Sequence, residues 1–280
     1  MKSLKGINLT LNRFKALSPN IGRMSYLQFL YLSKNQLTSI PPEIGLLTNL
    51  RTVSFAENQL TSLPREICKL TNLRVLLLQQ NNIVEIPEDI GNLQHLNELD
   101  MSINNIGEIP TGIGKLQQLQ QLCLSFNKIK HIPSEIGQIS NLQKLELNNN
   151  LIQELPHSIG MLTRLQFLRL DKNEIEWLPK EMRRCFSLKQ IDLSENRLCL
   201  VPSNVGMLRN LHHLYLRLRS IPREIDFRNL PELKLIDLTN NPLISKRISD
   251  KGRFETTQRK MLVFMDAIWF QGDIWFLFFF

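Results

Sequence analysis

Apolar residues recur along the chain with one fixed spacing. In the copy around Asn35, the apolar positions are Leu27, Leu30, Leu32, Leu37, Ile40, Ile44, Leu47 and Leu50. The arrangement returns every 23 residues, and each copy places an asparagine at the same position: Asn12, Asn35, Asn58, Asn81, Asn104, Asn127, Asn150, Asn173 and Asn196. Such strict register indicates an internal repeat, which has to be interpreted before any single motif.

Each copy predicts one short strand and one turn. The apolar residues five and three positions before the asparagine, such as Leu30 and Leu32, are separated by one residue, so both point inward from a strand. After the asparagine, an Ile-Pro step at Pro41 ends the extended segment, and the spacing of Ile44 and Leu47 predicts a helical or 3₁₀ turn. Because no copy can bury its apolar face alone, we expect parallel strands stacked in a curved solenoid.

The repeated asparagine is predicted to be structural. It lies where the chain turns toward the core, and a side-chain amide both donates and accepts hydrogen bonds. We therefore expect it to satisfy buried backbone groups that would otherwise lack partners.

The unit L-x-x-L-x-L-x-x-N-x-L, followed by IPxxIG as in Ile40–Gly45, resembles the 23-residue class of intracellular leucine-rich repeats. That class includes the Shoc/Sur-type Ras-binding scaffold and the plant Ras-group-related repeat proteins. The resemblance covers roughly residues 4–243. It implies an α/β solenoid, a leucine-rich repeat horseshoe with a parallel concave β-sheet and short 3₁₀, helical or irregular convex segments.

The domain prediction follows from the extent of the repeat. We expect about ten repeats over residues 1–243, and a C-terminal capping helix with an apolar tail over 244–280. The tenth copy is a predicted weak joint, because Leu216 to Ile221 spans five residues where Leu32 to Ile40 spans eight. Arg219 occupies the position at which an asparagine is expected.

Charge and composition exclude several classes of protein. The 280 residues carry a net charge of +8 and are 42% hydrophobic, which is too apolar for a disordered tail and too charged for a multi-span membrane protein. The charge divides into +7 over residues 1–74, −5 over 75–163 and +6 over 164–280. An acidic middle argues against nucleic-acid binding, which needs a continuous basic stripe. No apolar leader follows Met1, so we expect a cytoplasmic protein.

Residues that point outward from the strands are the candidates for binding. An aromatic and aliphatic zone, an acidic centre and a mixed end are predicted along the sheet, and exposed aromatic and arginine side chains are common interface anchors. The candidate partner-binding residues are Phe29, Tyr31, Val75, Leu77, Glu98, Asp100, Glu146, Phe167, Arg169, Asp192, Tyr215 and Arg217.

Catalytic chemistry has no candidate constellation in the sequence. The five histidines occupy unrelated repeat positions, and no phosphate-binding or nucleophile motif occurs, so no catalytic residue, cofactor or metal site is predicted. Cys123 is expected to be an ordinary exposed thiol. The segment Arg51–Phe55 matches a phosphatase-docking motif, but Val53 and Phe55 fall on inward positions, so we interpret it as core.

Two functions remain open from the sequence. The first is a non-catalytic scaffold that binds a signalling or regulatory protein through the concave face, and the resemblance implies a small GTPase or a phosphatase as partner. The alternative is a membrane-peripheral or cytoskeletal adaptor localised by its C-terminal tail. A basic cluster in the tenth copy is interpreted as a solvated face rather than an anion site: Arg217, Arg219, Arg223 and Arg228.

Overall fold

The structure is a computed structural model that describes residues 4–198, 203–216 and 230–237. The irregular part of the tenth copy, the arginine cluster that begins at Arg217, and the predicted cap and tail over residues 244–280 lie outside the described residues. The division into two domains therefore stays a prediction.

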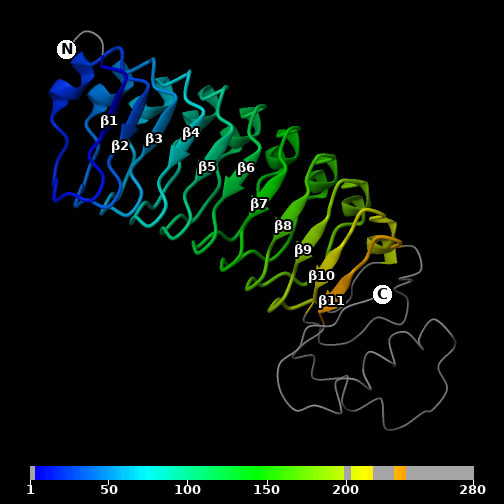
Figure 1. The fold of residues 1–280 in the computed structure, drawn as a ribbon. Helices are drawn as coiled ribbons and strands as arrows, with labels where there is room; N and C mark the ends of the chain where they lie inside the picture. Colours follow the sequence, from blue (N-terminus) through cyan, green and yellow to red (C-terminus); the bar gives the residue numbers. More distant parts are fainter. Residues whose placement is uncertain (1–3, 199–202, 217–229, 238–280) are drawn as a thin grey trace, which may run out of the picture.

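The described residues form one parallel sheet of eleven strands in sequence order (Figure 1). Each strand pairs only with its sequence neighbours, and corresponding residues of successive copies are partners, such as Leu30 with Val53. The strands are β1 (Gly6–Asn8), β2 (Phe29–Tyr31), β3 (Thr52–Ser54), β4 (Val75–Leu77), β5 (Glu98–Asp100), β6 (Gln121–Cys123), β7 (Lys144–Glu146), β8 (Phe167–Arg169), β9 (Gln190–Asp192), β10 (His213–Tyr215) and β11 (Leu235–Asp237).

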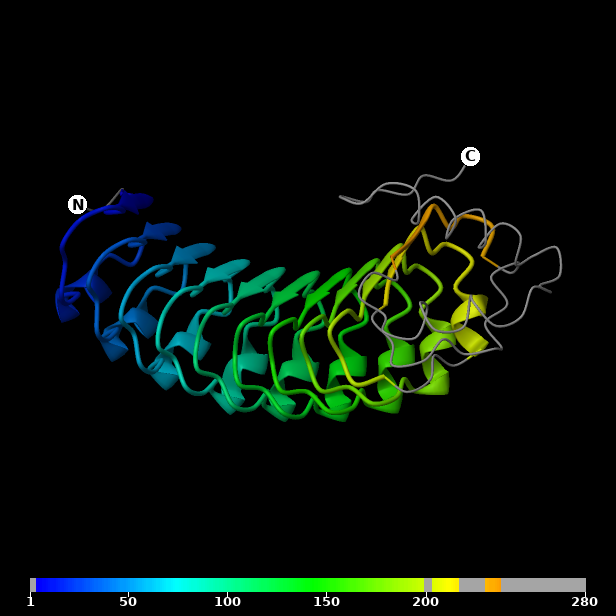
Figure 2. The same cartoon turned by 90° about the horizontal axis from the view of Figure 1, so that it is seen from below.

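In the described part of the chain, a short 3₁₀ helix follows each of the strands β1 to β9 and lies on the outer side of the stack. Figure 2 shows the strands along the inner side of an arc and the helical turns along its outer side. The turns are η1 (Pro19–Arg23), η2 (Pro42–Leu46), η3 (Arg65–Lys69), η4 (Glu88–Asn92), η5 (Thr111–Lys115), η6 (Ser134–Gln138), η7 (His157–Met161), η8 (Lys180–Arg184) and η9 (Ser203–Met207). The predicted horseshoe with a concave parallel sheet is confirmed.

The core lies between the sheet and the turns, and it consists of the repeated apolar positions. Leu30 and Leu32 of the strand, and Ile44 and Leu47 of the turn, have no exposed surface. Proline precedes the turn, as at Pro41. Its backbone is still extended, with a ψ of 146°, and η2 begins at the next residue, so the extended segment ends at the Ile-Pro step as predicted. Burial of apolar area between successive copies is the main favourable contribution to the stability of such a stack.

The repeated asparagine is structural, as the sequence predicts. Asn58 donates from Nδ2 to the carbonyl oxygens of Leu32 (2.9 Å) and Phe55 (3.0 Å). Its Oδ1 accepts from the backbone N–H of Leu37 at 3.0 Å. One side chain thereby satisfies backbone groups of its own copy and of the preceding copy, and the same three contacts recur at Asn81.

A second row of side chains bridges the copies at the start of the strands. Asn49 and Asn72 donate from Nδ2 to the carbonyl oxygens of Ser25 (2.8 Å) and Thr48 (2.9 Å). Asn49 and Asn72 lie nine positions before the core asparagines, and two later copies make the same contact, through Asn141 to the carbonyl oxygen of Gln117 and through Asn210 to that of Phe186. The sequence analysis missed this row, although the recurring T-N-L and S-N-L triplets were a signal for it.

Close packing of the outer turns requires glycine. A Cβ at Gly137 would lie 2.4 Å from the carbonyl oxygen of Ser158, and one at Gly160 would lie 2.3 Å from that of Glu181. No described glycine has a positive φ, so its role here is close approach and not an unusual backbone conformation.

Candidate functional site

The sheet register assembles the candidate residues into two rows across the concave face. The first row runs through residues such as Phe29, Val75 and Glu98, and the second through Tyr31 and Asp100. Neighbouring strands lie about 4.8 Å apart. The structure therefore brings together side chains that are separated by 23 residues in sequence.

Six of the candidates lie on β2, β4 and β5, with Thr52 and Ser54 of β3 between the β2 and β4 members. Val75 pairs with Glu98 and Leu77 pairs with Asp100, so an apolar pair lies directly beside an acidic pair. All the members retain solvent exposure. We call this group the N-terminal patch: Phe29, Tyr31, Val75, Leu77, Glu98 and Asp100.

The two carboxylates of the N-terminal patch form no ion pair with a described residue, although the charge of Asp100 is felt at Lys144, two strands away. Within the described part of the chain, no Lys, Arg or His lies within ion-pair distance of Glu98 or Asp100. Asp100 Oδ1 accepts hydrogen bonds from the backbone N–H of Ser102 (2.9 Å) and from its hydroxyl (2.7 Å). Two negative charges on one short strand that no direct ion pair compensates repel each other and favour a cationic partner.

Glu146 does not belong to this acidic surface. Its Oε2 lies 3.0 Å from Lys144 Nζ, and its Oε1 lies 3.8 Å from Arg169 Nη1. Arg169 Nε in turn lies 3.7 Å from Asp171 Oδ1. Burial, the largest single influence, acts to lower the pKa of Lys144, but the hydrogen bond to Glu146 and the nearby negative charges, including those of Glu146 and Asp100, together raise it. The predicted acidic centre is thus corrected, because β7 and β8 carry a charge-balanced network and the uncompensated charge is on β5.

The prediction that Cys123 is exposed is wrong. Its relative solvent-accessible surface is only 9%, and its Sγ donates to Glu146 Oε2 at 3.2 Å. Burial, followed by the charge of Glu146 and their hydrogen bond, raises the pKa of this thiol strongly. Cys123 lies at an outward position of β6, but its side chain is buried and is in contact with Glu146 of β7. A protonated, covered thiol is a poor nucleophile.

The remaining candidates form a second group over β8 to β10. Arg169 pairs with Asp192, and Asp192 pairs with Tyr215. Burial and then the charges of Asp192 and Asp237 raise the pKa of Tyr215. Phe167 is 40% exposed at the edge of this group, which β6 and β7 separate from the N-terminal patch. Arg217 lies outside the described residues.

The phosphatase-docking interpretation is excluded by burial. Val53 and Phe55 have no exposed surface, in agreement with the prediction that they belong to the core.

Within the described residues, no three His, Cys, Asp or Glu side chains are grouped to hold a metal ion.

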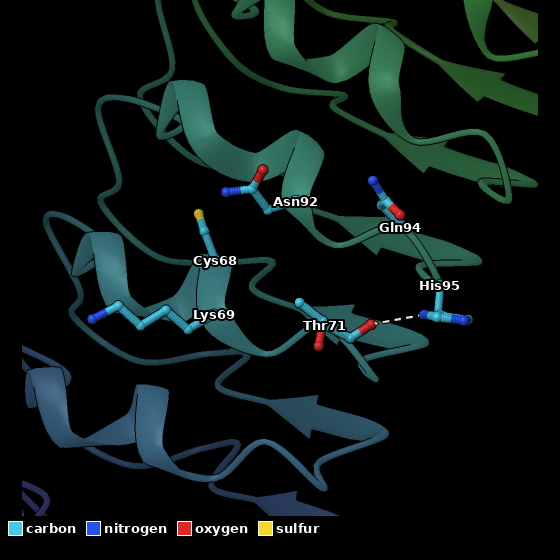
Figure 3. A pocket seen from close by; sticks show the side chains of 6 residues that line it. All are labelled: Cys68, Lys69, Thr71, Asn92, Gln94 and His95. Atoms are coloured by element: carbon cyan, nitrogen blue, oxygen red, sulfur yellow. Dashed lines mark hydrogen bonds between the residues drawn. The ribbon is translucent and has the colours of Figure 1, made fainter.

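A notch opens on the outer side between η3 and η4 (Figure 3). Cys68 occupies the position that is glycine in the neighbouring copies, and its side chain keeps these two turns from packing as extensively as most others. The notch has a volume of about 510 Å³, and His95 Nδ1 lies 2.9 Å from the carbonyl oxygen of Thr71 at its edge. Cys68 itself is buried, and burial first, then Asp89 and Glu66, raises its pKa to about 12.

A smaller hollow of about 190 Å³ lies at the start of the strands. Its lining residues are polar or basic and include Arg51 and Arg74, which have no ion pair within the described residues. Both arginines are exposed to solvent, so this hollow is a basic surface rather than an enclosed site. It accounts for part of the positive charge of the first 74 residues.

None of the described helices has the length and apolar character needed to cross a membrane. The alternative of an adaptor localised by its tail concerns residues 244–280, which lie outside the described part of the chain.

Comparisons with known proteins agree with the repeat. A family described as a leucine-rich repeat region matches residues 65–129. A second, described as leucine rich repeat, matches residues 25–83 and 117–175, so the two together span 25–175 without a gap. A comparison with curated proteins found no match.

Several solved structures share the fold. A leucine-rich repeat protein from Leptospira interrogans is 36% identical over 85% of this chain and 61% of its own, with a TM-score of 0.78. The plant peptide hormone receptor RGFR1, solved in complex with RGF2, is 30% identical over 85% of this chain and 48% of its own, with a TM-score of 0.66.

PEPR1, solved with AtPEP1, is 31% identical over 85% of this chain and 38% of its own, with a TM-score of 0.69. The chain therefore spans less than two thirds of the length of each of these solved chains. The repeat, the sheet and these matches agree on one assignment: the chain is a leucine-rich repeat protein.

Proposed function

We propose that the chain is a non-catalytic scaffold that binds a protein partner through the N-terminal patch on its concave face. The observation that carries the proposal is the direct pairing of Val75 and Leu77 with Glu98 and Asp100. This arrangement places half-buried apolar side chains beside two carboxylates that form no ion pair with a described residue. Apolar anchors give an interface its affinity, and uncompensated charge gives it selectivity for a partner of opposite charge.

The comparisons support a protein ligand in general terms. RGFR1 was solved in complex with RGF2, and PEPR1 with AtPEP1, on the same kind of repeat. No enzymatic family is among the matching families. Two narrower expectations, a small GTPase or phosphatase partner and a role in signal transduction, rest on the resemblance to Ras-binding scaffolds alone. The expected cytoplasmic location rests on the sequence that follows Met1.

Charge reversal in the patch tests the proposal. We expect Glu98→Lys/Asp100→Lys to lose the proteins that wild type captures from cell extract, and crosslinks of captured proteins to fall on β2 to β5. Added salt should weaken the wild-type capture, because the contact is partly electrostatic. The matched control is Glu85→Lys/Asp89→Lys, which makes the same charge change at exposed positions away from the concave face, Asp89 lying in η4.

The control variant should capture the same proteins as wild type. Identical captured proteins for the patch variant and wild type, or crosslinks confined to the outer turns, would refute the concave-face proposal. Mass spectrometry of the captured proteins also shows whether a small GTPase or a phosphatase is among them.

A further inference from the structure

One position of the repeat holds the backbone in the left-handed region. The residue before each core asparagine has a φ between 53° and 60° in nine successive copies. These residues are Leu11, Lys34, Glu57, Gln80, Ile103, Phe126, Asn149, Lys172 and Glu195. Asparagine tolerates this region well, whereas a β-branched residue is strained in it, and Ile103 is the β-branched residue of the nine.

Ile103 and Phe126 are neighbours in the stack, and both are exposed. The backbone N–H of Ile103 donates to the carbonyl oxygen of Ser125 at 2.8 Å, and that of Asn104 donates to the carbonyl oxygen of Phe126 at 3.2 Å. The side chain of Ile103 is 44% exposed and that of Phe126 is 50% exposed. We call these two side chains the apolar ridge.

Folding alone does not account for the apolar ridge. An apolar side chain at this position gains only part of the benefit of burial, and isoleucine also adopts a disfavoured backbone conformation there. The preceding and following copies hold Gln80 and Asn149 at the same position, which are polar and suit an exposed turn. Strain retained on an exposed apolar surface points to a contact with another molecule.

The position of the ridge indicates the chemistry of that molecule. Ile103 follows the end of β5 by three residues, and β5 carries the uncompensated carboxylates of Glu98 and Asp100. We propose that the apolar ridge anchors an apolar side chain of a protein partner whose neighbouring Arg or Lys faces Glu98 and Asp100. The occupant is thus a partner segment in which apolar and basic residues alternate. This inference rests on the proposed concave-face function and specifies the partner's chemistry.

Labelled synthetic peptides test the inference directly. Three peptides of equal length are compared by fluorescence anisotropy: one alternating Arg and Leu, one alternating Arg and Ser, and one alternating Glu and Leu. They are titrated with wild type, with Ile103→Asn/Phe126→Asn, and with Glu98→Gln/Asp100→Asn. The matched control is Leu46→Asn/Met161→Asn, which removes two side chains of 61% and 57% exposure from the outer turns η2 and η7.

We expect the Arg-Leu peptide to bind wild type and the control variant equally. Its affinity should fall roughly tenfold or more in the ridge variant, as for a buried apolar anchor. The Arg-Ser and Glu-Leu peptides should bind wild type more weakly by a similar factor, because each lacks one half of the recognition.

The contrary results separate the two proposals. Equal binding of the Arg-Leu peptide to wild type and the ridge variant, with loss in the Glu98→Gln/Asp100→Asn variant, would overturn the ridge and leave the N-terminal patch standing. If the Arg-Leu peptide bound wild type no more tightly than the Glu-Leu peptide does, both the ridge and the N-terminal patch would be overturned. Self-association of wild type in analytical ultracentrifugation, abolished in the ridge variant, would assign the ridge to a second copy of this chain and overturn the proposed occupant.

Thermal unfolding distinguishes a binding role from a structural one. Ile103→Asn installs the residue that Asn149 supplies three residues beyond the end of β7, so the Tm should stay equal or rise by a few °C as strain is relieved. A clear fall in Tm would show that Ile103 is retained for folding, which contradicts the inference.

Discussion

One asparagine per repeat satisfies several buried backbone groups at once. Asn81 donates from Nδ2 to the carbonyl oxygens of Phe55 and Leu78, each at 3.0 Å, and its Oδ1 accepts from the N–H of Leu60 at 3.0 Å. An aspartate or an alanine lacks the donor, and a lysine lacks the acceptor. This double requirement explains why the position is invariant over nine copies in one chain.

Loss of one such asparagine should be costly. We expect Asn81→Ala to lower the free energy of unfolding by about 2–4 kcal/mol, because it leaves buried donors and acceptors without partners. Urea unfolding followed by circular dichroism measures the change. The adjacent Asn82→Ala removes an exposed amide and serves as control, with an expected change within about 0.5 kcal/mol. Equal losses in the two variants would contradict the role assigned to the buried row.

Asp171 should make stability depend on pH. Burial first, then the charge of Asp192, raises its pKa, and its Oδ1 is buried without a hydrogen bond. Because the pKa of Asp171 is higher in the folded than in the unfolded protein, protonation of this carboxyl stabilises the fold. The contribution is fully present below the pKa of the unfolded protein and is lost as the pH rises through the folded pKa. We expect Asp171→Asn, which copies Asn148 of the preceding repeat, to be more stable than wild type at neutral pH.

The gain at neutral pH should be roughly 1 kcal/mol or less and should shrink on acidification. Urea unfolding of both proteins from acid to neutral pH measures it. Parallel stability curves would show that Asp171 does not titrate with a raised pKa.

The outer turns are held together by backbone contact at glycine. Turns such as η6 and η7 pack on the next through a glycine at which a Cβ would meet a carbonyl oxygen. Where that residue is Cys68, the adjoining turns pack less and a notch opens between them. The side chain at one position of the repeat thus influences how extensively two neighbouring turns pack.

A glycine pair makes this argument testable. Gly137→Ala places a Cβ 2.4 Å from the carbonyl oxygen of Ser158, so we expect a loss of about 1–3 kcal/mol in unfolding free energy from overpacking. The control is Gly107→Ala, where no atom lies within 4 Å of the added Cβ and the change should be near zero. Differential scanning calorimetry compares the two. If both variants unfolded at the same temperature as wild type, the turns could accommodate the added Cβ without loss of stability, which would contradict the overpacking argument.

Charge at the scale of the whole molecule is distributed by the stacking of the repeats. The first 74 residues carry +7 and the next segment, 75–163, carries −5. Part of the positive charge lies at Arg51 and Arg74 at the start of the strands, whereas Glu98 and Asp100 face the concave side. The same molecule therefore presents different signs of charge on different faces. We expect added salt to weaken the binding of a cationic partner to the concave face, because salt screens exposed charges such as those of Glu98 and Asp100.

The sequence by itself determined the fold and most of its internal chemistry. The strict 23-residue period predicts the strand and the turn of each regular copy, and an asparagine that is buried in the inner copies from Asn35 to Asn173. The same period assigned Val53 and Phe55 to the core, where they lie.

Only the tertiary structure decided the state of the outward residues. Whether Cys123 is covered, and whether Glu146 is neutralised while Glu98 is not, depends on side chains one repeat away in either direction. The strain at Ile103 is likewise a property of the backbone path. A periodic pattern specifies which side chains point outward, but their exposure, charge and strain depend on which neighbours the stacking places beside them.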